Sequence, residues 1–191
     1  MRNDTGLIRS IDFTKTDALA QARGIAFFVA LTAIGAKVYI PHEPVPFTLQ
    51  TLFVVLSGAF LGWRNGVISM TAYLLLGAVG IPVFAGSIAG PSVFAGTTAG
   101  YLFGFVVAAG IVGAIIKANR SFFWTVLSMF AGFTTIFACG TFYLNMVFIH
   151  NWQISFTQGF LIFSYWDLIK LGAAIGVYRA FMPRYAIHNS L

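Results

Sequence analysis

Long apolar segments alternate along the chain with short stretches that are rich in Gly, Pro and charged residues. Six apolar segments can be marked, at residues 18–40, 49–62, 66–79, 98–116, 122–149 and 159–182. A helix needs about 20 residues to cross the hydrocarbon core of a bilayer. The second and third segments are shorter, so they are either two short, tightly packed spans or one re-entrant hairpin. The pattern predicts an all-α integral membrane protein with six transmembrane helices.

The composition excludes an ordinary soluble domain. Charged residues make up 8% of the 191 residues and hydrophobic residues 59%, and the mean hydropathy is +0.87. A soluble domain carries about 25% charged residues. The chain cannot cover a water-facing surface, so its surroundings are expected to be a lipid bilayer. A net charge of +6 could indicate a nucleic-acid partner in a soluble protein, but the positions of the charges give another explanation here.

The basic residues indicate the orientation of the chain. All Lys and Arg residues except Lys37 and Lys170 fall on one side of a six-helix topology: Arg2, Arg9, Lys15, Arg23, Arg64, Lys117, Arg120, Arg179 and Arg184. Because Lys and Arg concentrate in cytoplasmic loops, both termini are predicted to lie in the cytoplasm. Cytoplasmic tails of residues 1–17 and 183–191 would then flank a membrane domain of residues 18–182. We expect this domain to reside in the cell membrane.

The two loops predicted to face outward have distinctive compositions. Residues 41–50 contain the stretch PHEPVPF, in which repeated Pro removes backbone donors and excludes a helix. Residues 80–100 are rich in Gly, Ala and Ser and carry no charge. Non-helical backbone near membrane depth is tolerated where it is buried in protein or lines a cavity. Both loops are therefore predicted to cap a ligand pocket.

One pair of opposite charges lies inside the last apolar segment. In the stretch YWDLIKLGAA, Asp167 and Lys170 are three residues apart, which places them on one face of a helix. A charge at the centre of a membrane helix costs about 2.5–3.5 kcal/mol on insertion scales, and such groups usually face the bundle interior. The two charges either only neutralise each other or form a polar cluster at the floor of an outward-facing pocket. Such a cluster suits a ligand with N–H groups and with C=O or carboxylate groups.

Small residues repeat along one face of the first segment. Ala22, Ala26 and Ala30 follow one another at intervals of four residues, a pattern that lets another helix approach closely. The pattern alone does not separate a partner helix within the chain from one in another protein. Lys37, near the outer end of the same segment, is expected to extend toward the polar interface.

Motifs for catalysis and for metal or nucleotide binding are missing from the sequence. No Lys follows a Gly, so there is no phosphate-binding loop, and there is no H-E-x-x-H or C-x-x-C. His42 and Glu43 are two potential ligands, which do not make a metal site. We therefore expect neither an enzyme nor a bound cofactor. An ion-coupled secondary carrier for a small carboxylate or vitamin, with Asp167 as the relay, and a membrane scaffold remain as alternatives.

Four stretches in a fixed order are similar to a known family. They are PVPFTLQTLFVVLSGAFLG, YLLLGAVGIPVFAG, GTTAGYLFGF and WDLIKLGAA, within residues 20–180. The chain resembles the BioY family, the biotin-specific substrate-binding subunits (S components) of energy-coupling-factor transporters. The resemblance implies six membrane helices around a biotin site in the outer half of the bilayer. The loops around residues 41–50 and 80–100 would close that site.

The resemblance also implies roles for individual residues. Asp167 and Lys170 match the D-L-I-K of the family's last helix and are expected to contact biotin. The further residues expected at the site are Phe47, Phe84 and Tyr101, packing on the bicycle, and Thr48, Gln50, Thr98 and Gly100. The alanine face of the first helix would dock to a membrane coupling subunit. Two cytoplasmic ATPases complete such a transporter.

The chain departs from the family pattern at two places. It reads GTTAGY at residues 96–101, where the family commonly reads G-P-T-G-G-Y, and its stretch GSIAG at residues 86–90 has no arginine. The resemblance therefore does not indicate which group would hold the carboxylate of biotin. Lys170 or a backbone N–H group of the Gly-rich loop are the two alternatives.

Overall fold

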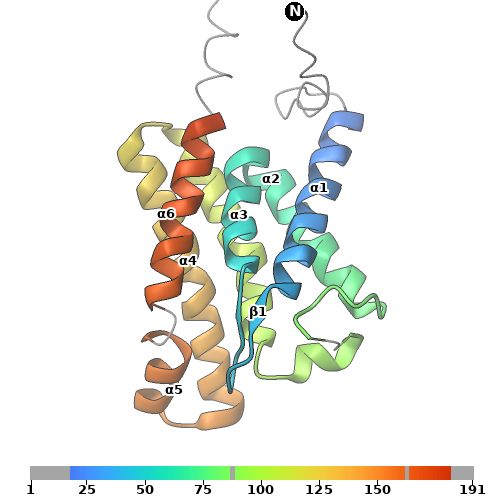
Figure 1. The fold of residues 1–191 in the computed structure, drawn as a ribbon, viewed down its shortest axis with the longest axis vertical. Coiled ribbons are helices and arrows are strands. Elements are labelled where there is room, and N and C mark those ends of the chain that lie inside the picture. The colour runs from blue at the N-terminus through green and yellow to red at the C-terminus, as the bar shows by residue number, and fades with distance from the viewer. Residues whose placement is uncertain (1–17, 87–88, 162–163, 182–191) are drawn as a thin grey trace, which may run out of the picture.

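The computed structural model describes residues 18–86, 89–161 and 164–181, which form a bundle of helices (Figure 1). The predicted cytoplasmic tails, residues 1–17 and 183–191, lie outside the described residues. The elements in chain order are α1 (Ala18–Lys37), β1 (Tyr39–Ile40), β2 (Phe47–Thr48), α2 (Gln50–Ala78), η2 (Pro91–Ala95), α3 (Ala99–Ala118), α4 (Phe122–Leu144), η3 (Asn145–Ile149), α5 (Trp152–Gly159) and α6 (Ser164–Phe181). The prediction of an all-helical protein is confirmed, apart from one two-residue strand pair.

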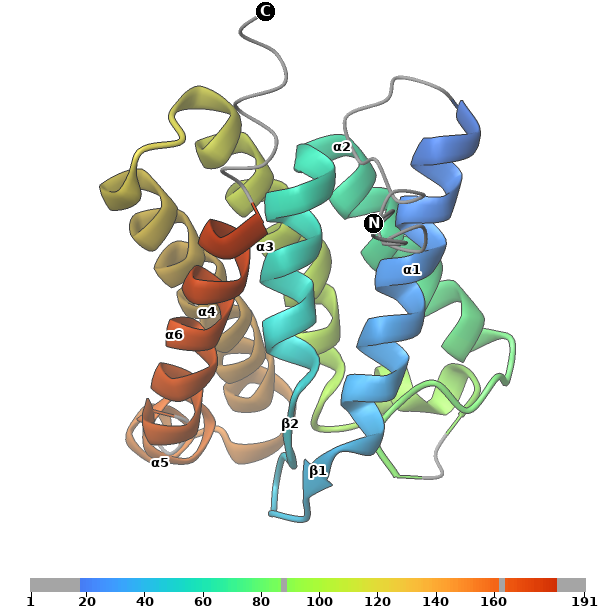
Figure 2. The same cartoon turned by 45° about the horizontal axis from the view of Figure 1, so that its top comes forward.

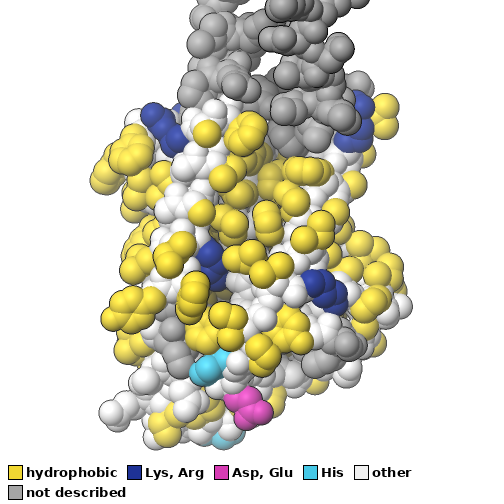
Figure 3. Space-filling view, viewed as in Figure 1, with side chains coloured by type: hydrophobic (Ala, Val, Ile, Leu, Met, Phe, Trp, Pro, Cys, Tyr) yellow, Lys and Arg dark blue, Asp and Glu magenta, His cyan; other side chains and the backbone are white. Residues whose placement is uncertain are grey.

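Four helical segments among the described residues are long and apolar enough to cross a membrane. They are Ala18–Lys37, Gln50–Ala78, Ala99–Ala118 and Phe122–Ile149. Figure 3 shows apolar side chains over most of the visible outer surface. Basic side chains lie near the end of the bundle where α1 begins and α6 ends. This surface is that of a protein surrounded by lipid rather than by water.

The helix α2 is folded in two at Gly62. This glycine has φ 74° and ψ 173°, a conformation that is essentially restricted to Gly. Gln50 Nε2 lies 2.6 Å from Tyr73 Oη, whereas 23 residues of straight helix would span about 34 Å. A Cβ on Gly66 would lie 2.9 Å from the Cα of Gly58, so the two halves are in backbone contact. The apolar segments 49–62 and 66–79 therefore form two antiparallel, closely packed helices.

The end of the chain differs from the sequence prediction. The sixth apolar segment was predicted to begin at about residue 159, but α6 begins at Ser164 and is preceded by a separate short helix, α5. The Asn151 side chain caps α5 by accepting a hydrogen bond from Ile154 N (3.1 Å). At the end of α5, the carbonyl of Gly159 accepts a hydrogen bond from Tyr101 Oη (2.8 Å). This tertiary contact fixes the end of α5 and is invisible in the apolar pattern.

The core lies where α2, α3 and α4 meet. Its fully buried side chains include Met70, Tyr73, Met129 and Ile136. The first half of α2 lies between α1 and α6 in both ribbon views (Figures 1 and 2). At the end of the bundle opposite the start of α1, the antiparallel pair β1–β2 and the irregular residues between α2 and α3 cover the helices. The two loops predicted to cap a pocket therefore lie at one end of the molecule.

Candidate functional site

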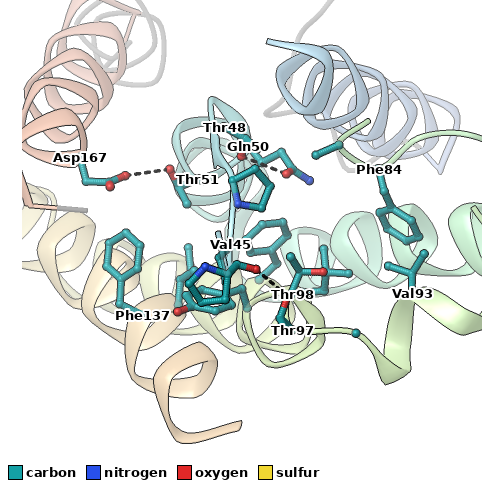
Figure 4. Close-up of a pocket in the computed structure, with 18 of the residues that line it drawn as sticks. Val45, Thr48, Gln50, Thr51, Phe84, Val93, Thr97, Thr98, Phe137 and Asp167 are labelled. Carbon is teal, nitrogen blue, oxygen red and sulfur yellow. Dashed lines mark hydrogen bonds between the residues drawn. The ribbon is translucent and has the colours of Figure 1, made fainter. Parts of the chain in front are cut away.

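A cavity of about 310 Å³ lies beneath these two loops (Figure 4). Its walls come from the loop before β2, the start of α2, the irregular segment before α3, and the helices α3, α4 and α6. Figure 4 shows Asp167 on one side of the cavity and Phe84 on the other. Segments from both halves of the chain thus meet around one space, which is the usual form of a small-ligand site.

Asp167 and Lys170 form a buried ion pair at one side of the cavity. Lys170 Nζ is paired with Asp167 Oδ1, as their spacing on α6 predicts, and the exposed fractions of the two side chains are 9% for Lys170 and 6% for Asp167. Lys170 Nζ also donates to Thr48 O (2.9 Å) and Thr51 Oγ1 (2.9 Å). A Lys ammonium has three donors, so Lys170 is fully used within the protein.

The two carboxylate oxygens of Asp167 differ in their hydrogen bonding. Thr51 Oγ1 donates to Asp167 Oδ1 (3.3 Å), but Asp167 Oδ2 is buried without a hydrogen-bond partner among the described residues. Buried polar atoms in native proteins are almost always paired, because an unpaired one costs about 1–3 kcal/mol or more. Asp167 lines the cavity, and its Oδ2 is an acceptor that no described residue uses.

Gln50 forms a second polar group of the wall. Its Nε2 donates to Tyr73 Oη (2.6 Å), and its Oε1 accepts from Thr48 Oγ1 (2.9 Å). Both ends of the amide are therefore held, and the side chain is only 5% exposed. The start of α2 thus presents a fixed polar group to the cavity beside the ion pair.

Aromatic side chains supply most of the apolar wall. Phe84, Tyr101, Phe105 and Phe137 line the cavity from the loop, from α3 and from α4. The Tyr101 hydroxyl does not offer its hydrogen to a ligand, because it donates to Gly159 O (2.8 Å). Flat apolar surfaces around a few fixed polar groups suit a ligand that is largely apolar with a small polar head.

The two loops are joined to each other over the cavity. Thr97 Oγ1 donates to Pro44 O (2.6 Å), and both residues line the cavity (Figure 4). This bond links the loop that precedes β2 with the segment that precedes α3, although 53 residues separate its partners. The structure therefore joins the two capping loops directly to each other.

The structure brings most of the expected site residues together. Those that line the cavity are Thr48, Gln50, Phe84, Thr98, Tyr101, Asp167 and Lys170. Phe47 does not line it, because successive residues of a strand point to opposite sides, and its ring lies 5.1 Å from that of His42. Gly100 does not line it either. A Cβ there would lie 2.3 Å from the Cβ of Tyr143, so Gly100 permits close packing of α3 on α4.

Several lining residues were missed in the sequence. Thr51 follows Thr48 by three residues, and the spacing of an early helical turn could have indicated it. Val45 and Thr97 belong to the capping loops but had no distinguishing chemistry. Phe105 and Phe137 lie in uniformly apolar helices, where no period separates a cavity-facing side chain from a lipid-facing one.

The alanine face of α1 is not covered by any described part of the chain. Ala22, Ala26 and Ala30 are all exposed, while Gly24 and Phe28 on the opposite side of the helix are buried. Among the described residues, no group of three or more His, Cys, Asp or Glu side chains lies close enough together to hold a metal ion.

Fold and surface together define a helical membrane protein. A crystal structure described as the S component for biotin from an ECF-type ABC transporter superposes with a TM-score of 0.81 and 24% identity, covering 89% of this chain and 94% of that one. The BioY family model matches residues 10–187, so the chain belongs to the BioY family.

Proteins named as biotin transporters are similar in sequence to this chain. The biotin transporter BioY of Thermotoga maritima is 44% identical over 147 residues, which cover 77% of this chain and 86% of that protein. The biotin transporter BioY of Rhizobium etli is 34% identical over 185 residues, covering 90% and 95% of the two chains. The relatives are thus named as transporters and not as enzymes.

Proposed function

We propose that this protein binds biotin and serves as the substrate-binding component of a vitamin uptake transporter. The observation that carries the proposal is Asp167, which lines a cavity of about 310 Å³ and has a buried Oδ2 that no described residue pairs. The ureido ring of biotin has N–H groups that such an oxygen can accept. Membership of the BioY family and the names of the relatives support the same ligand.

The remaining groups of the cavity fit the other parts of biotin. Phe84 and Phe137 would pack on the apolar bicycle and thioether. Lys170 keeps Asp167 in place and neutralises it, and its three acceptors leave it no spare donor for the biotin carboxylate. At the start of α3, the N–H groups of Ala99, Tyr101 and Leu102 already donate to Gly96 O or Thr98 O. The backbone N–H groups of Thr97 and Thr98, which line the cavity just before the helix, are then the better candidates for that carboxylate.

The same proposal includes the arrangement in the membrane. The two halves of α2 would each cross the bilayer, as would α1, α3, α4 and α6, which gives six crossings. The charge bias puts both termini in the cytoplasm and the capped cavity toward the outer face of the cell membrane. The exposed alanine face of α1 would dock to a membrane coupling subunit that works with a pair of cytoplasmic ATPases.

The alternative of an ion-coupled secondary carrier is not favoured. Such a carrier would use Asp167 as a relay, whereas this carboxylate is paired with a Lys that is itself fully hydrogen-bonded. The family and the named relatives also point to biotin transport.

Equilibrium binding of labelled biotin to the purified protein in detergent tests the proposal. Saturable binding that unlabelled biotin displaces, and that riboflavin and thiamine leave in place, is the expected result. A folded protein that binds no biotin at micromolar concentration would refute the assignment of the ligand.

A further inference from the structure

The loop segment beside the cavity is held by side chains of two other elements. Lys37 Nζ, at the end of α1, donates to Phe84 O (2.8 Å) and to Gly86 O (2.9 Å). Tyr73 Oη, in the second half of α2, donates to Val83 O (3.0 Å). Neither Lys37 nor Tyr73 lines the cavity, so both act on this segment from outside the proposed ligand site.

These bonds determine where the ring of Phe84 lies. The ring forms part of the cavity wall and is 3% exposed. It meets the ring of Tyr73 edge-on (centroids 5.4 Å apart, interplanar angle 90°) and the ring of Phe94 (5.9 Å, 89°). A Cβ on Gly77 would lie 2.1 Å from the Phe84 ring, so the ring is seated directly against the backbone of α2. A shift of this loop segment would therefore move the cavity wall.

Tyr73 connects this wall to the ion pair on the other side of the cavity. Its hydroxyl accepts a hydrogen bond from Gln50 Nε2 (2.6 Å), and the Gln50 amide accepts one from Thr48 Oγ1 (2.9 Å). The backbone carbonyl of Thr48 accepts one from Lys170 Nζ (2.9 Å). A continuous series of hydrogen bonds thus runs from Lys170 to Val83 through Tyr73, whose exposed fraction is 0%. Buried networks with every member paired make the surrounding structure rigid.

We propose that Tyr73 is a positioning residue for the bound ligand. It fixes Gln50 on one side of the cavity and the backbone of Val83, next to Phe84, on the other, and Lys37 secures the same loop segment from α1. Tyr73 does not touch the ligand, and its role is to keep the wall and the capping loop in place while the ligand is bound. This inference rests on the proposed function, because the ligand is taken to be biotin.

The first test measures the rates of biotin binding and release. Tyr73→Phe removes one hydroxyl and leaves Gln50 Nε2 and Val83 O without their partner. We expect the dissociation rate constant of labelled biotin to rise by about tenfold or more, as the loss of a buried hydrogen bond allows, with an association rate constant changed less than about threefold. The matched control is Tyr178→Phe, which removes the hydroxyl of another buried tyrosine whose ring packs on Phe60 and does not line the cavity, and which should leave both rate constants unchanged.

The second test follows the loop without any ligand. Ala85, in the same loop segment, is replaced by Cys in a Cys139→Ala background, and its rate of alkylation by a water-soluble maleimide is measured. Tyr73→Phe and Lys37→Met should each increase that rate, and Tyr178→Phe should not. If Tyr73 only stabilised the core, Tyr73→Phe would not selectively change the alkylation rate at position 85 or the dissociation rate constant of biotin.

The outcomes separate the inference from the proposed function. If the wild type binds biotin and Tyr73→Phe releases it at the wild-type rate, the positioning role is overturned, whatever the alkylation shows. If the wild type binds no biotin, the proposed function fails, and the alkylation rates alone decide whether Tyr73 sets the loop. Should Tyr73→Phe not fold, Tyr73→Met removes the same hydroxyl with a flexible side chain, and unchanged alkylation at position 85 in that variant would overturn the inference.

Discussion

At the scale of single residues, the two members of the ion pair on α6 are not equivalent. Lys170 has an acceptor for each of its three donors, whereas Asp167 has one oxygen without a partner among the described residues. The carboxylate is therefore the group of the pair that is available to a ligand. Lys170 supports it by charge and by its bonds to Thr48 and Thr51 at the start of α2.

This difference predicts the behaviour of two variants. Asp167→Asn leaves Lys170 as a buried charge without its counter-ion, which costs about 3–5 kcal/mol of stability. It also replaces the carboxylate acceptor for biotin with a neutral amide, which has one acceptor oxygen fewer. The double variant Asp167→Asn, Lys170→Gln has no buried charge and should recover most of that stability. We expect it to bind biotin at least about tenfold more weakly than the wild type.

Thermal unfolding and equilibrium biotin binding of the same preparations distinguish a ligand contact from structural support. If the pair only holds α6 against α2, the double variant should regain both stability and wild-type affinity. Recovery of the affinity would therefore contradict the proposed role of Asp167.

At the scale of elements, the fold-back of α2 places Gln50 and Tyr73 side by side. The reversal depends on Gly62, which has a positive φ of 74° and leaves room for a Cβ. Backbone conformation and not space is therefore the constraint at this position. The reversal brings the start of α2 next to its second half, and so assembles one polar side of the cavity.

Substitution of this glycine should be destabilising for a backbone reason alone. Gly62→Ala should lower the stability by about 1–3 kcal/mol, because a side chain is strained in that conformation. Gly172→Ala is the matched control, since Gly172 lies within α6 with nothing within 4 Å of an added Cβ. Ala in a helix is favoured over Gly by roughly 0.5–1 kcal/mol, so the control should be neutral or stabilising. Equal melting temperatures for the two variants in detergent would contradict a strained reversal at Gly62.

The elements also show how far the sequence could predict the site. The apolar segments predicted the helices, and the spacing of Asp167 and Lys170 predicted their common face, because both depend on local periodicity. The placement of Phe47 away from the cavity depends on the alternation of a two-residue strand, which the Pro-rich composition concealed. The break between α5 and α6 and the cavity-facing side of α4, with Phe137, depend on tertiary contacts. An apolar pattern contains no information about those contacts.

At the scale of the whole molecule, the two ends of the bundle differ. The cavity and its capping loops lie at one end, while α1 begins and α6 ends at the other. The alanine face of α1 runs along the outside between them, and none of the described residues covers it. Ligand binding and partner docking are thus expected on separate surfaces, which allows them to be disrupted separately.

The separation predicts the effect of a bulky residue on α1. Ala26→Trp should leave biotin affinity within about twofold of the wild type and abolish co-purification with the membrane coupling subunit, because close helix approach requires a small side chain. Phe130→Trp, at a position of α4 that is 54% exposed, is the control and should preserve both properties. If Ala26→Trp still assembles with the coupling subunit but binds biotin more weakly, the alanine face packs against other parts of the protein itself, and the docking prediction is wrong.

The central claim is that Asp167 Oδ2 accepts an N–H group of biotin. Competition against labelled biotin by an analogue methylated on the ureido nitrogens tests it most directly, since the analogue keeps the bicycle, the thioether and the carboxylate. The account predicts that the wild type binds this analogue at least about tenfold more weakly than biotin, and that the Asp167→Asn, Lys170→Gln variant discriminates between them by less than about threefold. Equal discrimination by the two proteins would contradict the role of this oxygen.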